Sequence, residues 1–222
     1  MRIALLGGTG DIGGGLALRW AYETNHEVLI GSRDPERART AAAAYETELD
    51  SRGRERKVNG FRNEMAADRA DVAVLAVPPS HVGDAVDAVA EKLDAETILV
   101  SPAVGMRSDD DGLHYNPPPA GSVTELVADR APDGVPVVGA FHSLSADRLA
   151  NLDLEFELDT LLVGDDADAK ATVRLLAEGI EGLRALDAGP LSNAAEVERL
   201  TPLSINVGRF NDGLHDLGVR FS

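Results

Sequence analysis

A glycine-rich turn near the N-terminus constrains the fold of this 222-residue chain more than any other feature. An apolar segment, residues 2–6, runs directly into the pattern Gly8-x-Gly10-x-x-Gly13, and a helical pattern follows. Glycines at these positions allow a tight turn, the approach of a pyrophosphate to the backbone, and close packing of a helix on a sheet. We therefore expect dinucleotide binding at this turn. The candidate binding residues are Gly8, Thr9, Gly10, Asp11, Ile12 and Gly13.

Apolar segments alternate with helical patterns over the first two thirds of the chain. Continuous apolar runs of this kind are typical of parallel strands that helices cover on both faces. Asp34 followed by Pro35 predicts the start of one helix, and a second is expected at 80–93. The predicted strands are 2–6, 27–30, 58–61, 72–77, 97–100 and 135–140. We predict an α/β fold, a doubly wound Rossmann-type parallel sheet that occupies residues 1–145.

The pattern changes after this point, and we predict a small C-terminal α/β extension, residues 146–222. Strands at 160–163 and 183–186 flank a helix at 165–178, and Ser192 is placed to cap a last long helix. An apolar stripe follows that helix at helical spacing. Its members are Val197, Leu200, Leu203, Val207 and Phe210. Such a stripe favours core packing or a contact between subunits, and we expect a homo-oligomer.

The residues after the second predicted strand distinguish NAD from NADP. NAD enzymes usually place Asp or Glu there to bind the ribose 2′-hydroxyl. This chain has Gly31-Ser32-Arg33 instead, with Arg37 one helical turn further on. A hydroxyl and two guanidinium groups suit a 2′-phosphate. We therefore predict NADP, bound by Ser32, Arg33 and Arg37, with solvated arginines at a helix start as the alternative.

The charge balance narrows the range of partners. The chain has 38 Asp and Glu against 21 Lys and Arg, a formal net charge of −17. A diffuse negative charge disfavours nucleic acid and anionic membranes. Lysine is scarce, as in proteins kept soluble in concentrated salt, so we expect a halophilic source. Cysteine, a secretory signal and an apolar run of membrane-spanning length are absent, and we expect a cytoplasmic protein.

His142 follows the strand predicted at 135–140, at the sheet edge where such folds bind their ligands. It is a candidate to position a substrate or to act as an acid, and a buried structural histidine is the alternative. No other residues are spaced with it for a metal site, and the patterns GxSxG and HExxH are absent. We expect neither a bound metal nor hydrolase chemistry.

Several stretches together resemble the archaeal reduced coenzyme F420:NADP oxidoreductases. The similarity begins in the first strand and glycine turn and returns near the C-terminus, so it spans nearly the whole chain. The C-terminal stretches are more specific than the glycine turn, which many dehydrogenases share. The matching segments are 2–13, Gly31-Ser32-Arg33, 71–75, 100–102, 150–153, 186–193, Leu200-Thr201-Pro202-Leu203 and Arg209-Phe210-Asn211.

This resemblance implies hydride transfer between NADP(H) and the 8-hydroxy-5-deazaflavin coenzyme F420. It implies a nicotinamide near 142–146 and Leu217, with the deazaflavin over it in a cleft between the sheet edge and the C-terminal part. His142 would support the geometry without being an obligatory proton donor. The NADP contacts that the family pattern implies are residues 9–12, Ser32, Arg33, Arg37, Pro79, Gly83, Ala146 and Leu217.

Two residues depart from the family pattern. Pro79 stands where members carry an aromatic residue, and Ser145 stands where they carry proline. Both fall in the expected cleft and bear on the second substrate more than on NADP. The alternatives are an NADP-dependent reductase of another small molecule, of the imine type, and a non-catalytic NADPH sensor. The fold alone does not distinguish these functions. An assay for deazaflavin reduction does.

Overall fold

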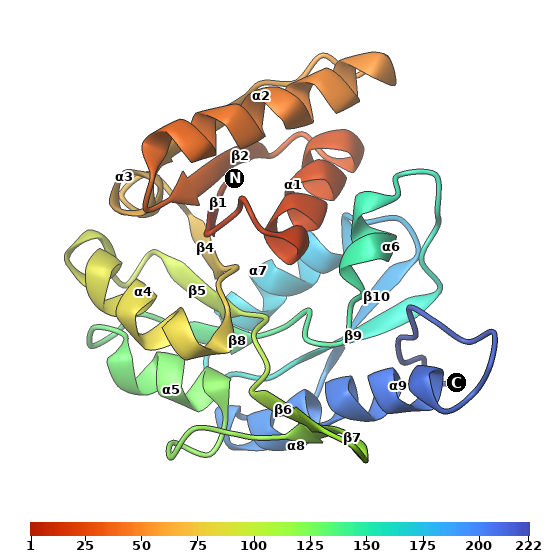
Figure 1. The fold of residues 1–222 in the computed structure, drawn as a ribbon. Helices are drawn as coiled ribbons and strands as arrows, with labels where there is room; N and C mark the ends of the chain where they lie inside the picture. The colour runs from red at the N-terminus through yellow and green to blue at the C-terminus, as the bar shows by residue number, and fades with distance from the viewer.

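The computed structural model describes residues 1–222 and has three layers, with a parallel sheet between two sets of helices (Figure 1). The sheet order is β3-β2-β1-β4-β5-β8, and every neighbouring pair is parallel. This is the Rossmann order, in which the chain returns to the middle of the sheet between β1 and β4. The predicted fold class is confirmed. The strands are β1 (Arg2–Leu6), β2 (Glu27–Ser32), β3 (Val58–Arg62), β4 (Val72–Leu75), β5 (Ile98–Ser101) and β8 (Val137–Gly139).

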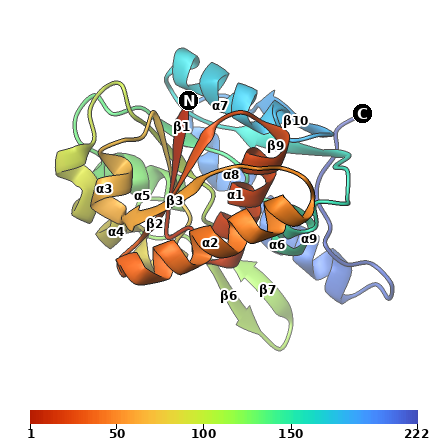
Figure 2. The same cartoon turned by 90° about the horizontal axis from the view of Figure 1, so that it is seen from above.

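Alternation along the strands builds one core on each face of the sheet. In β1, Ile3 and Leu5 belong to the larger core, and Ala4 and Leu6 to the smaller one. Figure 2 shows α1 and α2 on one side and α3, α4 and α5 on the other. The larger core is covered by α1 (Asp11–Glu23), α2 (Pro35–Ser51) and α7 (Ala167–Glu178). The smaller core is covered by α3 (Asn63–Ala67), α4 (Val82–Val89) and α5 (Val123–Arg130).

The C-terminal residues continue the larger core. A parallel pair, β9 (Leu158–Leu162) and β10 (Leu183–Asp187), lies beyond β8, and an antiparallel bridge between Gly139 and Val163 connects it to the main sheet. The larger core contains 32 buried residues, among them Leu162 as well as Leu5. Residues on both sides of position 145 therefore share one hydrophobic core.

Arg19 fixes α6 (Ala146–Ala150) against α1. Its side chain is 1% exposed and donates to the carbonyls of Arg148, Leu149, Asn151 and Leu154. It also pairs with Glu23 at 2.8 Å, and its guanidinium lies 4.8 Å from the centre of the Phe156 ring. One charged side chain thus bonds four backbone carbonyls of α6 and of the loop that follows it.

Three predicted elements differ from those observed. The strand predicted at 72–77 ends at Leu75, because Ala76-Val77 turn toward the proline pair. The helix predicted at 80–93 is α4 flanked by 3₁₀ turns at Pro79–His81 and Ala90–Lys92. The last helix is divided into a 3₁₀ turn (Leu191–Asn193), α8 (Ala194–Glu198) and α9 (Leu200–Arg209), and no side chain caps it, so the predicted cap at Ser192 is wrong.

Residues 109–112 form a turn that joins an unpredicted hairpin of β6 (Met106–Asp109) and β7 (Gly112–Tyr115). Figure 1 shows the hairpin beside α9. Asn206 of α9 fixes it there: its Oδ1 accepts from Leu113 N at 2.8 Å and its Nδ2 donates to Leu113 O at 2.7 Å. The hairpin and α9 are therefore held together by a side chain that mimics a strand neighbour.

Candidate active site

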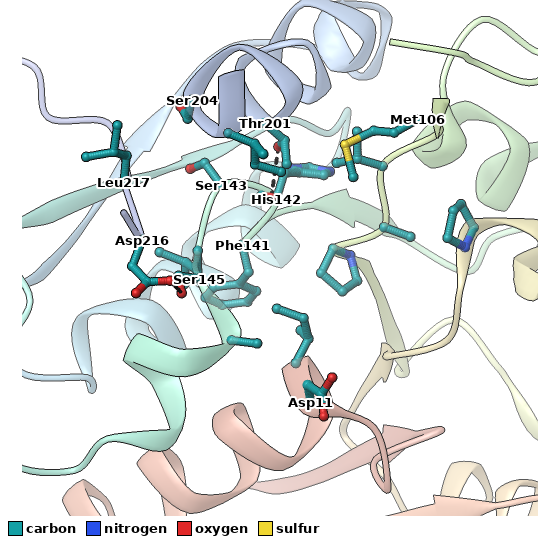
Figure 3. Close-up of a pocket in the computed structure, with 18 of the residues that line it drawn as sticks. Asp11, Met106, Phe141, His142, Ser143, Ser145, Thr201, Ser204, Asp216 and Leu217 are labelled. Carbon is teal, nitrogen blue, oxygen red and sulfur yellow. Dashed lines mark hydrogen bonds between the residues drawn. The ribbon is translucent and has the colours of Figure 1, made fainter. Parts of the chain in front are cut away.

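One large cavity, of about 970 Å³, opens at the carboxyl ends of β1 and β4. This is the point where the strand order reverses and where open α/β sheets bind their ligands. Figure 3 shows Asp11 at the start of α1 on one side of the cavity and Thr201 of α9 on the other, with Met106 and Leu217 at its flanks. About half of its lining residues are apolar. Its walls come from segments far apart in the sequence.

The glycine turn leaves a free helix N-terminus at one end of this cavity. Gly10 is the N-cap of α1, and no side chain caps the helix. A Cβ on Gly10 would meet nothing closer than Gly7 O, at 3.7 Å, whereas one on Gly13 would lie 2.7 Å from Gly8 Cα. The backbone is thus open toward the cavity and tightly packed behind it. Free N–H groups and the helix dipole fit a pyrophosphate at this place.

The end of β2 presents cations without carboxylate partners. Ser32 is buried, and its Oγ accepts from Asp34 N at 3.2 Å. Asp34 caps α2 by accepting from Glu36 N, as predicted, and Glu36 pairs with Arg39. Arg33 and Arg37 are exposed and make no ion pair. In a chain of net charge −17, two unpaired guanidinium groups beside a hydroxyl fit a 2′-phosphate.

Helix α9 turns a narrow face of small and polar side chains toward the cavity. Thr201, Ser204, Ile205 and Gly208 line it, at spacings of three, four and seven residues. The opposite face carries Leu203, Val207 and Phe210, which are exposed, Leu203 to 59% and Phe210 to 64%. Of the apolar stripe predicted from the sequence, Val197 is buried in a small core cluster, whereas Leu203, Val207 and Phe210 are exposed.

His142 lines the cavity but is held from behind. Its ring is 6% exposed, and burial lowers the pKa of His142 to about 4. Its Nε2 lies 3.3 Å from Thr124 Oγ1, and the Thr124 hydroxyl donates to Glu198 Oε1 at 3.0 Å. Thr124 therefore accepts from Nε2–H, so the ring is neutral with Nδ1 unprotonated and without a partner. Thr201 Oγ1 donates to the His142 carbonyl at 2.9 Å, as Figure 3 shows.

Glu198 is a fully buried carboxylate at the α8–α9 junction. It accepts from the backbone N–H groups of Val123 and Thr124 at the start of α5, and from Tyr115 Oη at 3.0 Å. Burial raises the pKa of Glu198, and these hydrogen bonds act against that effect. It thereby ties α5, the hairpin and His142 to the same corner. Because burial keeps the ring neutral, His142 does not carry the second ring proton of an imidazolium at neutral pH.

The two departures from the family pattern both lie at the cavity. Pro79 opens the 3₁₀ turn after β4 and lines the cavity wall. Ser145 caps α6 by accepting from Arg148 N at 3.4 Å, and it donates to Asp216 Oδ1 at 2.6 Å. A proline at position 145 has no hydroxyl and makes neither contact.

The structure brings together about half of the residues predicted for the site. Those that line the cavity are Gly10, Asp11, Ile12, Pro79, His142, Ala146 and Leu217. Gly8, Thr9 and Gly13 belong to the glycine turn behind it, and Ser32, Arg33 and Arg37 lie at the end of β2 and the start of α2. Gly83 lies within α4, where a Cβ would approach the Arg130 guanidinium at 3.8 Å, and it does not reach the cavity.

The cavity wall opposite the glycine turn, formed by α9 and the start of β6 and called the far wall below, was not predicted from the sequence. Met106, Thr201, Ser204 and Arg209 line the cavity without having been predicted there. A signal for α9 was present, because its small and polar residues recur at helical spacing opposite the apolar stripe. A signal for α5 was also present: Ser122 is its N-cap, and its hydroxyl accepts from Glu125 N at 2.9 Å and donates to Glu125 Oε2 at 2.8 Å.

Comparison with known proteins identifies the family. The model of the family described as NADP oxidoreductase, coenzyme F420-dependent, matches residues 2–105. The F420-dependent NADP reductase of Methanocaldococcus jannaschii is 38% identical over 209 residues, which cover 93% of this chain and 92% of that protein. That of Methanothermobacter marburgensis is 38% identical over 225 residues, covering 100% and 98%. The chain belongs to this family.

The fold of this chain also matches a solved crystal structure over the full length of both chains. A protein of Arthrobacter sp. FB24 superposes with a TM-score of 0.81 at 26% identity, covering 100% of this chain and 99% of that one. The family resemblance drawn from the sequence is thus confirmed. None of the helices combines the length and apolarity needed to cross a bilayer. No three His, Asp or Glu side chains are grouped to hold a metal ion.

Proposed function

We propose that this protein transfers a hydride between NADP(H) and the 8-hydroxy-5-deazaflavin coenzyme F420. The observation that carries the proposal is the continuity of the cavity, which runs from the uncapped N-terminus of α1 to the face of α9. One end fits the phosphates of a dinucleotide, and a volume of about 970 Å³ has room for two stacked ring systems. Relatives that are 38% identical over nearly all of the chain and are named F420-dependent NADP reductases support the same activity.

We further propose a division of labour along the chain. Residues 1–145 bind NADP: the glycine turn holds the pyrophosphate, and Ser32, Arg33 and Arg37 hold the 2′-phosphate. Residues 146–222 complete the deazaflavin site and provide the contact between subunits. Ala146 and Leu217 lie beside the nicotinamide, and Pro79 belongs to the NADP side, whereas Gly83, within α4, makes no contact with the cavity.

Hydride transfer depends more on the relative position of the two rings than on acid–base catalysis by side chains. When bound, NADPH supplies the hydride from carbon 4 of its nicotinamide, and the deazaflavin accepts it at carbon 5. The residues of the chain bind the two rings at contact distance and exclude water from between them. The neutral His142 ring supports one wall of the cavity. Because the charge would be spread over its conjugated ring, the deazaflavin can take the completing proton from water after the transfer, and no side chain is needed as a dedicated acid.

Isotope transfer tests the proposal directly. NADPH carrying deuterium on the transferred face is mixed with the protein and the oxidised deazaflavin, and the product is analysed by mass spectrometry and NMR. The deuterium is expected at carbon 5 without exchange with solvent. Loss of the label to water rules out direct transfer. If NADPH binds and no deazaflavin is reduced in molar salt, the function is that of an NADPH sensor or of another NADP-dependent reductase.

We infer that the protein works in the cytoplasm, where NADP(H) is available, and that it is adapted to high salt. The net charge of −17 with three lysines supports a halophilic source, since dissolved salt screens the repulsion between its carboxylates. The melting temperature should rise strongly as KCl goes from dilute to molar. A melting temperature that stays flat over this range argues against salt adaptation.

We also propose a homo-oligomer in which α9 contributes to the contact. Its outer face presents Leu203, Val207 and Phe210 to solvent at spacings of four and three residues. A contiguous apolar face on one helix is typical of a surface that another chain covers. Light scattering should give a mass above that of one chain, and Leu203→Glu should reduce it. A wild-type protein with the mass of one chain contradicts this proposal.

A further inference from the structure

Two short segments lie side by side at the cavity although they are 71 residues apart. One is Ser145 with Ala146 at the start of α6, and the other is Asp216 with Leu217 in the C-terminal segment. All four residues line the cavity, and Figure 3 shows Asp216 next to Ser145. The residues placed beside the nicotinamide, Ala146 and Leu217, are thus the direct neighbours of the two that touch each other.

The contact is a short hydrogen bond from a hydroxyl to a carboxylate. Ser145 Oγ donates to Asp216 Oδ1 at 2.6 Å, and the other carboxylate oxygen lies 2.9 Å from His215 Nδ1. The bond from Ser145, followed by that from His215, holds the pKa of Asp216 below its ordinary value. Asp216 is therefore ionised at neutral pH, and a hydroxyl that donates to an ionised acceptor makes a strong bond.

The backbone of Asp216 is itself held in an unfavourable conformation. Its φ is +51°, one of two positive φ values among the non-glycine residues of the chain. Left-handed backbone at a residue other than glycine has an energetic cost and persists where surrounding contacts impose it. Downstream, Asp159 N donates to Val219 O at 2.8 Å and fixes the segment to β9. Upstream, the segment begins at Phe210, the C-cap of α9. Between these anchors, the bond to Ser145 joins it to the opposite wall.

We propose that Ser145 and Asp216 form a positioning pair for hydride transfer. Their hydrogen bond sets the spacing of two stretches of cavity wall, and so fixes the nicotinamide that lies between Ala146 and Leu217. Neither side chain exchanges a proton or a hydride with a substrate. The inference rests on the hydride transfer proposed above. It also gives a role to Ser145, which departs from the proline of the family pattern.

A double-mutant cycle on this bond tests the pair. Ser145→Ala and Asp216→Ala each remove the bond, from opposite sides. Each should lower kcat for deazaflavin reduction by about 2- to 10-fold, with a smaller change in KM for NADPH, because ring position is loosened while the phosphate contacts remain. The double variant should be no slower than the slower single variant. Asp216→Asn keeps an acceptor oxygen and tolerates the left-handed backbone, so it should recover most of the lost kcat.

Asp212→Ala is the matched control, because Asp212 is an exposed carboxylate of the same segment that makes no hydrogen bond or ion pair. It should leave kcat unchanged. If wild type reduces the deazaflavin and both single variants match Asp212→Ala, the positioning role is wrong while the proposed function stands. Additive losses in the double variant contradict the pair equally. If Ser145→Ala loses α6 with its cap, seen as a lowered melting temperature, then Asp216→Ala, which leaves the cap intact, decides alone.

Discussion

The two walls of the cavity are built in opposite ways. The side proposed to bind NADP consists of short continuous stretches, the glycine turn at residues 7–13 and, beyond the cavity lining, residues 32–37, which offer open backbone and unpaired charge to a ligand. The far wall is assembled by side chains that act over long separations, such as Glu198 on Thr124 N, 74 residues away, and Ser145 on Asp216. Function carried by backbone leaves a local pattern in a sequence, and function carried by distant side-chain contacts does not.

The largest expected effect comes from separating the two walls at Arg19. Arg19→Met removes a buried cation from four carbonyls and from Glu23. The free energy of unfolding should fall by about 3–5 kcal/mol, since unpaired polar groups then remain buried. Chemical denaturation measures the loss. Arg39→Met, which breaks an exposed pair with Glu36, is the control and should cost less than about 1 kcal/mol. Equal losses in both variants would contradict the role of Arg19.

The second effect is a pH dependence of the free energy of unfolding that comes from His142. Burial lowers the pKa of His142 from 6.5 to about 4, so the unfolded chain takes up a proton over this interval while the folded chain does not. Above pH 6.5 the residue is neutral in both states; between 6.5 and 4 stability is lost as pH falls; below 4 no more is lost. The total is about 3 kcal/mol. His142→Gln should lack this part of the pH dependence, and parallel curves of stability against pH for the two proteins would show that His142 is not buried neutral.

A third effect tests only the side proposed to bind NADP. Arg33→Ala should weaken NADPH binding by about 10- to 150-fold, the value of about 1.5–3 kcal/mol for a charge-assisted contact, and leave NADH binding nearly unchanged. Fluorescence titration with both nucleotides measures this. Arg39→Ala removes a guanidinium from the same helix that is already paired, and it should change neither affinity by more than a small factor. Equal losses for NADPH and NADH on Arg33→Ala would sink the assignment of the 2′-phosphate site.

The smallest effect is expected in the chemistry itself. A general acid contributes about 100- to 10,000-fold, so His142→Ala should cost less than about 100-fold in kcat if His142 only supports the wall. Steady-state kinetics with NADPH and the deazaflavin measure it. A larger loss, together with a pH profile that follows a single group, would mean that His142 supplies a proton and that the far wall takes part in the chemistry.

The sheet, the glycine turn and the cap at Asp34 were predictable because each depends on local rules. Continuous apolar runs recur between the helical patterns, and all six predicted strands of the main sheet are present with small shifts at their ends. The glycine turn and the cap at Asp34 need only their own neighbours. That Ser32 and Arg33, rather than an acidic residue, directly follow Gly31 can likewise be seen without knowledge of the fold.

The far wall was not predictable for physical reasons that particular residues make clear. The apolar stripe at Leu203, Val207 and Phe210 has helical spacing, but spacing does not say whether a neighbouring element covers it, and here none does. The helix was also predicted as continuous from Ser192, whereas it is divided before Leu200. In the sequence, Glu198 is indistinguishable from an exposed charged residue of a helix. It is buried because Tyr115 and the start of α5 pack against it in the folded chain.

The bond pair between Asn206 and Leu113 has a consequence for how ligands enter and leave. Because α9 and the hairpin are joined as if they were neighbouring strands, we expect them to move together and the Leu113 amide to exchange its hydrogen slowly. The segment from Phe210 to Gly213 is exposed throughout, and Gly213 has φ +82° and nothing within contact of a Cβ. The cavity thus has one stiff side and one compliant side. We expect flat rings to enter and leave over the compliant side, because the other side is held by paired hydrogen bonds.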